Sequence, residues 1–158
     1  MQKTNVIRML DKAKIPYTTA TYEVDESDLS GTHIAECTGM NPDTVFKTLV
    51  AKGDKTGCCV FCIPCAKEVD LKKAAKITGN KKVEFLHLKD LLPTTGYIRG
   101  GCSPIGMKKQ FSTYIHESAQ KFDTISVSGG MRGLQVILSP LALSEFIGAK
   151  FSDLISEE

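Results

Sequence analysis

Apolar side chains recur with two different spacings, and the change between them separates predicted helices from predicted strands. Near the N-terminus Val6, Ile7 and Leu10 are spaced as on one face of a helix, with Thr4 placed to cap it and Pro16 to stop it. Capping residues and terminal glycines predict further helices at residues 33–38, from 41 onward, at 70–78 and at 141–149. A short element of unassigned type is expected near residues 87–92.

Segments rich in β-branched and aromatic residues predict the strands. They are YTTATYEV from Tyr17, a hairpin of FKTLVAK and CCVFCIP turning at residues 53–57, and four later strands in YIRGG, TYIHES, TISVSGG and LQVILSP. Helices and strands mix without a strict βαβ alternation. The predicted fold class is therefore α+β, a single domain over residues 1–158 with a mixed, strongly curved sheet flanked by helices.

Composition excludes several classes of protein. With 42% apolar and 24% charged residues the chain has the composition of a globular domain, and its net charge of +2 predicts no general attraction to nucleic acid. No apolar run approaches the ~20 residues of a membrane span, and charges interrupt the N-terminus at Lys3, Arg8 and Asp11. We expect a cytoplasmic protein without a membrane partner.

The six cysteines raise the question of a metal site. Cys59, Cys62 and Cys65 follow two consecutive CxxC spacings, but no fourth ligand follows at a usual distance. On a strand Cys59 and Cys62 point to opposite faces, and free cysteine packs as a small apolar residue. The sequence favours core packing without a metal or other cofactor, and a metal or redox protein remains the alternative.

Conventional hydrolytic machinery is not evident in the sequence. His33, His87 and His116 fall in three different predicted elements, and none belongs to a recognisable motif with a serine or cysteine nucleophile. Each is expected to be a surface or structural histidine. A mechanism for this protein therefore has to work without an obvious general base.

Lys47 stands in a strand whose two faces both look buried. It shares a face with Leu49 and Ala51, while Phe46 and Val50 take the other. A lysine in this position meets an anion or lines a polar cleft, or else extends from the strand end to water. Position alone does not separate these interpretations.

Two glycine pairs could gather backbone donors. Gly100, Gly101, Gly129 and Gly130 permit positive φ and close backbone approach, so that N–H groups converge on a negative oxygen. Such donors form an oxyanion hole or a phosphate cradle. The alternative interpretation is two tight hairpin turns.

Lysines also cluster in and after the helix predicted at 70–78. They form either a solvated face or a weak contact for a nucleic-acid phosphate backbone. The residues concerned are Lys72, Lys73, Lys76, Lys81 and Lys82.

Four segments together resemble one known family. They are NPDTVFKTLV, DLKKAAKITGNKKVE, GYIRGGCSPIGMKK and SVSGGMRGLQVILSP, and in this order and spacing they resemble the YbaK/EbsC family of aminoacyl-tRNA deacylases. The likeness is to the branch that clears cysteine from proline tRNA, and it runs nearly end to end. It implies a barrel-like sheet, mischarged tRNA as substrate, no cofactor, and a transient complex with prolyl-tRNA synthetase.

The resemblance also implies the site. Lys47 matches the family's essential lysine, residues 100–104 match its GxxxP loop, and Gln135 stands where some relatives carry an acid. The stretch 28–31 faces the pocket by analogy. The implied catalytic residues are Lys47, Gly100 and Gly101, and the implied substrate-binding residues are Tyr22, Thr48, Cys102, Ser103, Pro104, Ser128, Gly129 and Gly130.

The implied mechanism needs no protein base, because the thiol of the bound cysteine attacks its own carbonyl and leaves as a thiolactone. Two alternatives stay open beside the metal or redox protein. One is the same fold acting on alanyl proline tRNA with water as nucleophile. The other is a module that binds tRNA or synthetase without catalysis.

Overall fold

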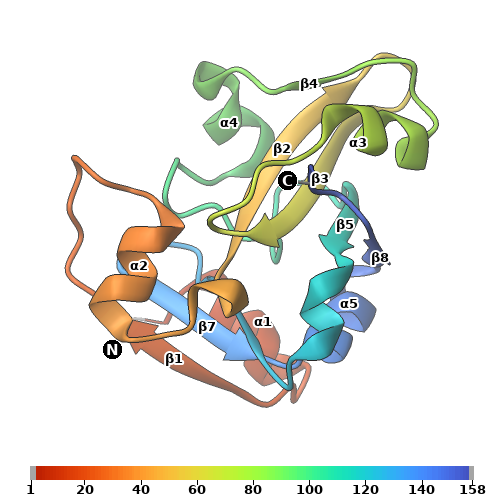
Figure 1. Cartoon of the computed structure of the whole chain (residues 1–158). Coiled ribbons are helices and arrows are strands. Elements are labelled where there is room, and N and C mark those ends of the chain that lie inside the picture. The colour runs from red at the N-terminus through yellow and green to blue at the C-terminus, as the bar shows by residue number, and fades with distance from the viewer. Residues whose placement is uncertain (1–2, 157–158) are drawn as a thin grey trace.

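Two β-sheets and five α-helices make up the fold in a computed structural model, which describes residues 3–156 (Figure 1). The helices are α1 (Asn5–Lys12), α2 (Gly31–Thr38), α3 (Leu71–Thr78), α4 (Leu88–Thr95) and α5 (Pro140–Ile147), with short 3-10 helices η1 (Pro42–Thr44) and η2 (Glu117–Lys121). The strands are β1 (Tyr17–Thr21), β2 (Phe46–Gly53), β3 (Gly57–Pro64), β4 (Val83–Phe85), β5 (Ser112–His116), β6 (Ile125–Ser128), β7 (Leu134–Leu138) and β8 (Lys150–Ser152). The α+β class is confirmed.

The smaller sheet has the order β1-β7-β6 and is antiparallel. The larger has the order β4-β2-β3-β5-β8, with antiparallel pairs around β2 and parallel pairs on both sides of β5. An isolated bridge between Val45 and Ser126 links the two sheets. The sheet is thus mixed and flanked by helices, as expected, but it is divided in two and not closed into a barrel.

Three apolar clusters hold these layers together. The largest joins both sheets to α1 and α5, with Val6, Ile7 and Leu10 of α1 fully buried in it. The second lies on the other face of the larger sheet, beneath Ala74 and Ala75 of α3. The third packs α2 against the start of β2 and the end of β3. Each strand of the β2–β3 hairpin therefore has apolar neighbours on both faces.

Local signals located most elements correctly. Thr4 accepts a hydrogen bond from the Ile7 N–H as the predicted cap of α1, and Gly39 and Gly79 end α2 and α3 with positive φ. The predicted strand YIRGG is wrong. This segment is a loop, because Gly96 and Gly100 adopt φ of 87° and 86° and the Gly101 N–H closes a turn on the Ile98 carbonyl. The three-residue strands β4 and β8 were not predicted.

Among the described residues no helix combines the length and the hydropathy needed to cross a membrane.

Candidate active site

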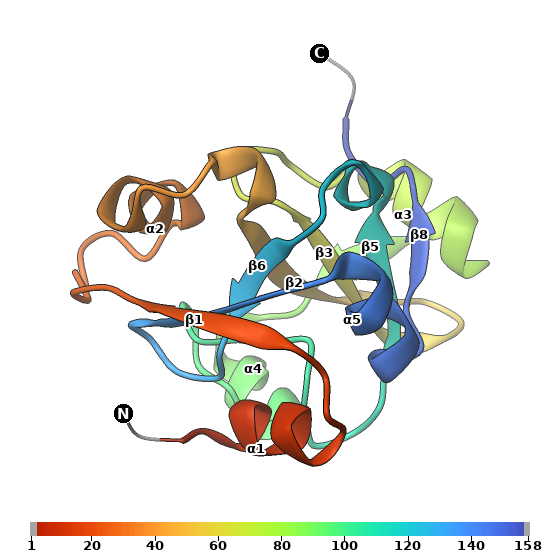
Figure 2. The same ribbon diagram turned by 90° about the horizontal axis from the view of Figure 1, so that it is seen from below.

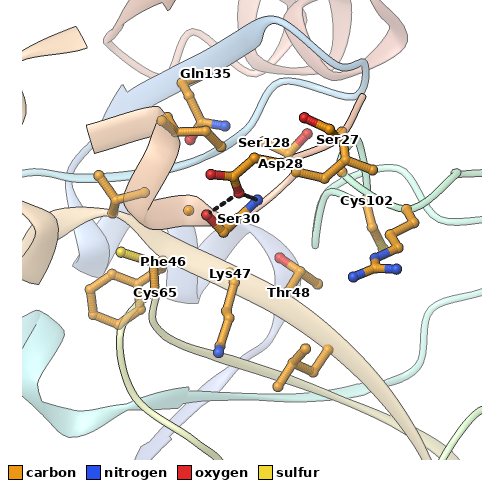
Figure 3. Close-up of a pocket in the computed structure, with 17 residues that line it drawn as sticks. Ser27, Asp28, Ser30, Phe46, Lys47, Thr48, Cys65, Cys102, Ser128 and Gln135 are labelled. Carbon is orange, nitrogen blue, oxygen red and sulfur yellow. Dashed lines mark hydrogen bonds between the residues drawn. The ribbon is translucent and has the colours of Figure 1, made fainter. Parts of the chain in front are cut away.

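A cavity of about 430 Å³ lies beside the first half of β2 (Figure 3). Its walls come from five separate stretches of the chain: the loop entering α2, the N-terminal part of β2, the end of β3, the loop after α4, and β6 with β7. The lining residues are Ser27, Asp28, Leu29, Ser30, Gly31, Ile34, Val45, Phe46, Lys47, Thr48, Leu49, Cys65, Arg99, Gly100, Cys102, Ser128 and Gln135.

An unpaired stretch of strand edge explains how neighbouring residues of β2 can share one cavity. β4 pairs only with residues 51–53 of β2, so residues 46–50 have a strand partner in β3 alone. Lys47 and Thr48 point to opposite faces of β2, as strand geometry requires, and both border the space beside this free edge (Figure 3). The structure thus brings the predicted lysine and threonine to the same cavity.

The two faces of β2 near Lys47 are buried as the sequence predicted. Phe46 and Val50 pack into the core shared by both sheets, and Ala51 packs beneath α3. The Lys47 side chain itself is 26% exposed, and its Nζ lies 3.7 Å from Oε1 of Glu68, a residue that is 81% exposed. The lysine therefore lines the cavity, and its ammonium has an ion-pair partner that is itself largely exposed to solvent.

The loop after α4 is unusually buried for a loop. Residues 101–105 are all buried, and the Tyr97 hydroxyl donates to the Ile105 carbonyl over 2.6 Å. A Cβ on Gly101 would lie 3.1 Å from the backbone nitrogen of Arg132, so this glycine allows the loop to pack directly on the 131–132 backbone. Residues 101–105 are consequently fixed by packing on the rest of the domain.

Two residues of this loop that border the cavity, Gly100 and Cys102, are candidate backbone donors, and Gly101 is not. The Gly101 N–H is occupied by the Ile98 carbonyl. Within the part of the chain that the structure describes, the N–H groups of Gly100 and Cys102 make no hydrogen bond, and both residues line the cavity. The pair available to an oxyanion is therefore Gly100 and Cys102.

The second glycine pair forms a hairpin turn. The Gly129 N–H donates to the Leu134 carbonyl over 2.9 Å, and the Gly130 N–H donates to Ser128 Oγ over 3.2 Å. Of this turn only Ser128 borders the cavity. The alternative interpretation from the sequence, a tight turn, describes Gly129 and Gly130.

Three other predicted residues support the walls without bordering the space. Tyr22 packs against the apolar cluster under α2, and Ser103 Oγ accepts the Ile105 N–H over 3.2 Å. Pro104 is buried beside Ser103 in the same loop.

Sequence reasoning missed Ser27, Ile34 and Arg99 as lining residues. Arg99 stands inside the glycine loop that was singled out, so its position next to Gly100 was the available signal. Ser27 belongs to an irregular polar loop with no periodicity, and nothing local predicts that this loop folds over β2. Gln135 is buried, and its Oε1 accepts from Ser126 Oγ over 2.6 Å.

Cys59, Cys62 and Cys65 are buried, as predicted. Cys59 lies in the core beneath α3 and Cys62 in the core between the sheets, on opposite faces of β3. Burial raises the pKa of Cys59 to about 11 and the pKa values of Cys62 and Cys102 to about 12. Among the described residues no group of three or more His, Cys, Asp or Glu side chains is arranged to hold a metal ion.

One histidine does touch a cysteine, contrary to the separation that the sequence suggested. His33 Nε2 lies 3.4 Å from Cys37 Sγ, one turn apart on α2. Neither residue borders the cavity, and Cys37 is exposed. The contact therefore supplies no base to the candidate site.

The predicted basic patch lies elsewhere. Figures 1 and 2 place α3 and α2 at opposite sides of the molecule, and the cavity lies near α2. Lys73 donates to Asp153 over 2.8 Å, and Lys82 pairs with Glu84 over 2.8 Å. A tRNA contact by this patch stays a prediction.

Comparison with known proteins identifies one family over most of the chain. The family model described as aminoacyl-tRNA editing domain matches residues 32–146. EbsC of Enterococcus faecalis strain V583, provisionally named a Cys-tRNA(Pro)/Cys-tRNA(Cys) deacylase, is 52% identical over 157 residues, covering 99% of this chain and 96% of its own. The uncharacterized protein YwhH of Bacillus subtilis strain 168 is 27% identical over 128 residues, 81% of each chain.

Solved structures confirm the fold. The crystal structure of a provisionally named trans-editing enzyme for prolyl-tRNA synthetase superposes with a TM-score of 0.82 at 21% identity, covering 99% of this chain and 100% of that one.

Proposed function

Because the chain belongs to the aminoacyl-tRNA editing domain family, we propose that it is a trans-editing deacylase that removes cysteine from mischarged proline tRNA. The 52% identity with EbsC over 99% of this chain supports this substrate. The cavity supports ester cleavage as the reaction class, since it is lined both by residues with free backbone N–H groups and by the half-buried Lys47.

The observation that carries the proposal is the pair of free N–H groups at Gly100 and Cys102. Cys102 is buried and Gly100 is partly exposed, and both stand in a loop fixed by the packing of residues 101–105, so they need little reorganisation when negative charge develops on an ester carbonyl oxygen. Lys47 supplies a positive charge on the facing strand, where it anchors the terminal ribose-phosphate or polarises the ester. Thr48 and Ser128 add hydroxyl groups that orient the substrate.

The chemistry follows from what the lining residues lack. No histidine is among the described residues that border the cavity, and the one carboxylate there, that of Asp28, is held by hydrogen bonds from Ser30. The thiol sulfur of the bound cysteine attacks its own carbonyl carbon, a carbon–sulfur bond forms, and the carbon–oxygen ester bond breaks. The thiol proton ends on the released ribose oxygen, and the products are a four-membered thiolactone and uncharged tRNA. Proximity within one molecule replaces the missing acid–base groups.

A panel of aminoacyl-tRNAs tests this function. Purified protein should deacylate cysteinyl proline tRNA and leave prolyl proline tRNA intact. Faster cleavage of the alanyl ester would favour the water-dependent deacylase, and binding without cleavage would favour a non-catalytic module. Stoichiometric metal in untagged protein would revive the metal or redox alternative.

The proposal extends to place and partner. Mischarged tRNA is met in the cytoplasm, and a transient complex with prolyl-tRNA synthetase would intercept it on release. Cross-linking of the two purified proteins in the presence and absence of tRNA tests that complex.

A further inference from the structure

The cavity is lined by charged side chains of both signs. Among the lining residues that the structure describes, Asp28 carries the one carboxylate, and Lys47 and Arg99 carry the cations. Figure 3 shows Asp28 on the loop above β2, with the Lys47 side chain pointing away from it. Lys47 instead forms an ion pair with Glu68. The carboxylate therefore faces the cavity without being neutralised by the lysine.

Local hydrogen bonds fix the Asp28 side chain and leave one oxygen for a ligand. Its Oδ1 accepts the Ser30 N–H over 3.1 Å and the Ser30 hydroxyl over 2.6 Å. Its Oδ2 lies 3.9 Å from His33 Nδ1, beyond hydrogen-bond distance. The bonds from Ser30 lower the pKa of Asp28, because they stabilise the ionised carboxylate.

The proposed substrate carries a group that matches this oxygen. An aminoacyl ester has a free α-amino group that is largely protonated near neutral pH. Its other charges are the phosphates of the tRNA, which suit the two cations of the cavity. The ammonium and the phosphate are thus offered separate partners of opposite charge.

We propose that Asp28 is the substrate-binding residue that pairs with the α-ammonium group of the aminoacyl ester, so that the site selects esters with a free amine over N-acylated ones. This inference rests on the proposed function for its choice of ligand. Its consequence is that peptidyl-tRNA and other N-acylated esters are excluded, because acylation removes the charge and adds bulk beside the carboxylate.

The chain supplies a matched control for the test. Asp25 makes the same local turn, with Oδ1 accepting the Ser27 N–H over 2.9 Å and the Ser27 hydroxyl over 2.6 Å. It does not border the cavity. Asp28→Asn and Asp25→Asn both keep an oxygen for the serine bonds, so each loop retains its structure. In Asp28→Asn the remaining amide N–H₂ then faces the ammonium and no longer attracts it.

Two measurements on the full chain separate this inference from the proposed function. The first is equilibrium binding, by calorimetry, of 3′-cysteinylamino-3′-deoxyadenosine, which has no ester to cleave, and of its N-acetyl form. The second is single-turnover deacylation of cysteinyl-tRNA and N-acetyl-cysteinyl-tRNA. Thermal unfolding of each variant shows that it is folded.

Wild type and Asp25→Asn should bind the free-amine analogue about tenfold more tightly than its N-acetyl form. Asp28→Asn should bind the two equally, with its N-acetyl affinity unchanged, and deacylation should follow the same order. A free-amine preference in binding that Asp28→Asn abolishes, without any deacylation by wild type, would support Asp28 while refuting the proposed function. Equal or absent binding of both analogues by wild type, or an unchanged preference in Asp28→Asn, would overturn the role of Asp28 whether or not the ester is cleaved.

Discussion

Replacing Cys102 with alanine tests which sulfur performs the attack. Cys102 lines the cavity and carries one of the two free N–H groups, so its thiol is the protein nucleophile that competes with the substrate thiol. It is 9% exposed, and burial raises its pKa to about 12. We expect Cys102→Ala to keep the deacylation rate, since alanine leaves the backbone donor in place.

The relative reactivity of the Cys102 thiol and the substrate thiol follows from their two pKa values. At pH 7.5 a thiol of pKa about 12 is about 0.003% ionised, whereas an ordinary cysteine thiol of pKa about 8.5 is about 9% ionised, a ratio of roughly three thousand. The more basic thiolate is the better nucleophile, and a Brønsted slope of about 0.4–0.5 returns a factor of roughly 25–60. The substrate thiol retains an advantage of about fifty- to a hundredfold, before its intramolecular position is counted.

The pH dependence of the deacylation rate distinguishes the two thiols independently of the Cys102→Ala variant. The attacking thiol must lose its proton, so the rate rises with pH and levels off once that thiol is ionised. Attack by the substrate thiol should level off near pH 8.5, whereas attack by Cys102 would continue to rise about tenfold per pH unit beyond pH 9. Uncatalysed ester hydrolysis is subtracted at each pH.

The assay is single-turnover deacylation of cysteinyl-tRNA by wild type, Cys102→Ala and Cys65→Ala, the last being the other thiol that lines the cavity. S-methyl-cysteinyl-tRNA should resist all three proteins, and the thiolactone should be trapped from the natural ester. A folded Cys102→Ala protein that loses more than tenfold in rate would refute the reasoning. So would cleavage of the S-methyl ester at a similar rate.

The remaining predictions concern charge and packing. Lys47→Ala should keep its melting temperature and lose about a hundredfold or more in single-turnover rate, and near wild-type turnover would remove Lys47 from the mechanism. Cys62→Ser places a hydroxyl in the core and should cost about 1–3 kcal/mol in urea unfolding while turnover per folded molecule is kept; selective loss of activity would contradict packing. Arg99→Gln should reduce by about one the slope of log affinity for tRNA against log salt concentration. A Lys72→Gln/Lys76→Gln double variant in the same titration tests whether α3 also contacts tRNA. An unaltered slope would show that these two lysines are exposed to solvent and do not bind tRNA.

Local sequence signals predicted the elements whose structure depends on local interactions. Asp70 and Gly79 delimit α3, and the turn at Gly57 closes the β2–β3 hairpin with a φ of 77°. The YIRGG segment misled the strand prediction because its composition is strand-like while its flanking glycines are left-handed. The division into two sheets depends on long-range pairing, such as β3 with β5, and the sequence carries no local sign of it.

The candidate site divides in the same way. Lys47 and the glycine loop were found because motif and burial agreed. The Asp28 wall was expected only by analogy, since it is an exposed polar loop held in place by the packing of Ile34 and Ala35 against Val45 and Cys65. Such a contact joins segments distant in sequence and leaves no periodic pattern in either.

Packing of the glycine loop explains how the N–H groups of Gly100 and Cys102 remain without a protein partner. An N–H group without a partner destabilises a folded protein, so a flexible loop would turn Gly100 and Cys102 toward an internal acceptor. Here the Gly101 N–H is tied to Ile98, Tyr97 is tied to Ile105, and Gly101 packs on the Arg132 backbone, which leaves the loop no such rearrangement. Under the proposed function the two donors exchange water for the ester carbonyl oxygen when substrate binds, and their hydrogen bonds strengthen as that oxygen becomes an oxyanion. In this proposal, the packing of the loop contributes to catalysis by holding the N–H groups of Gly100 and Cys102 in place.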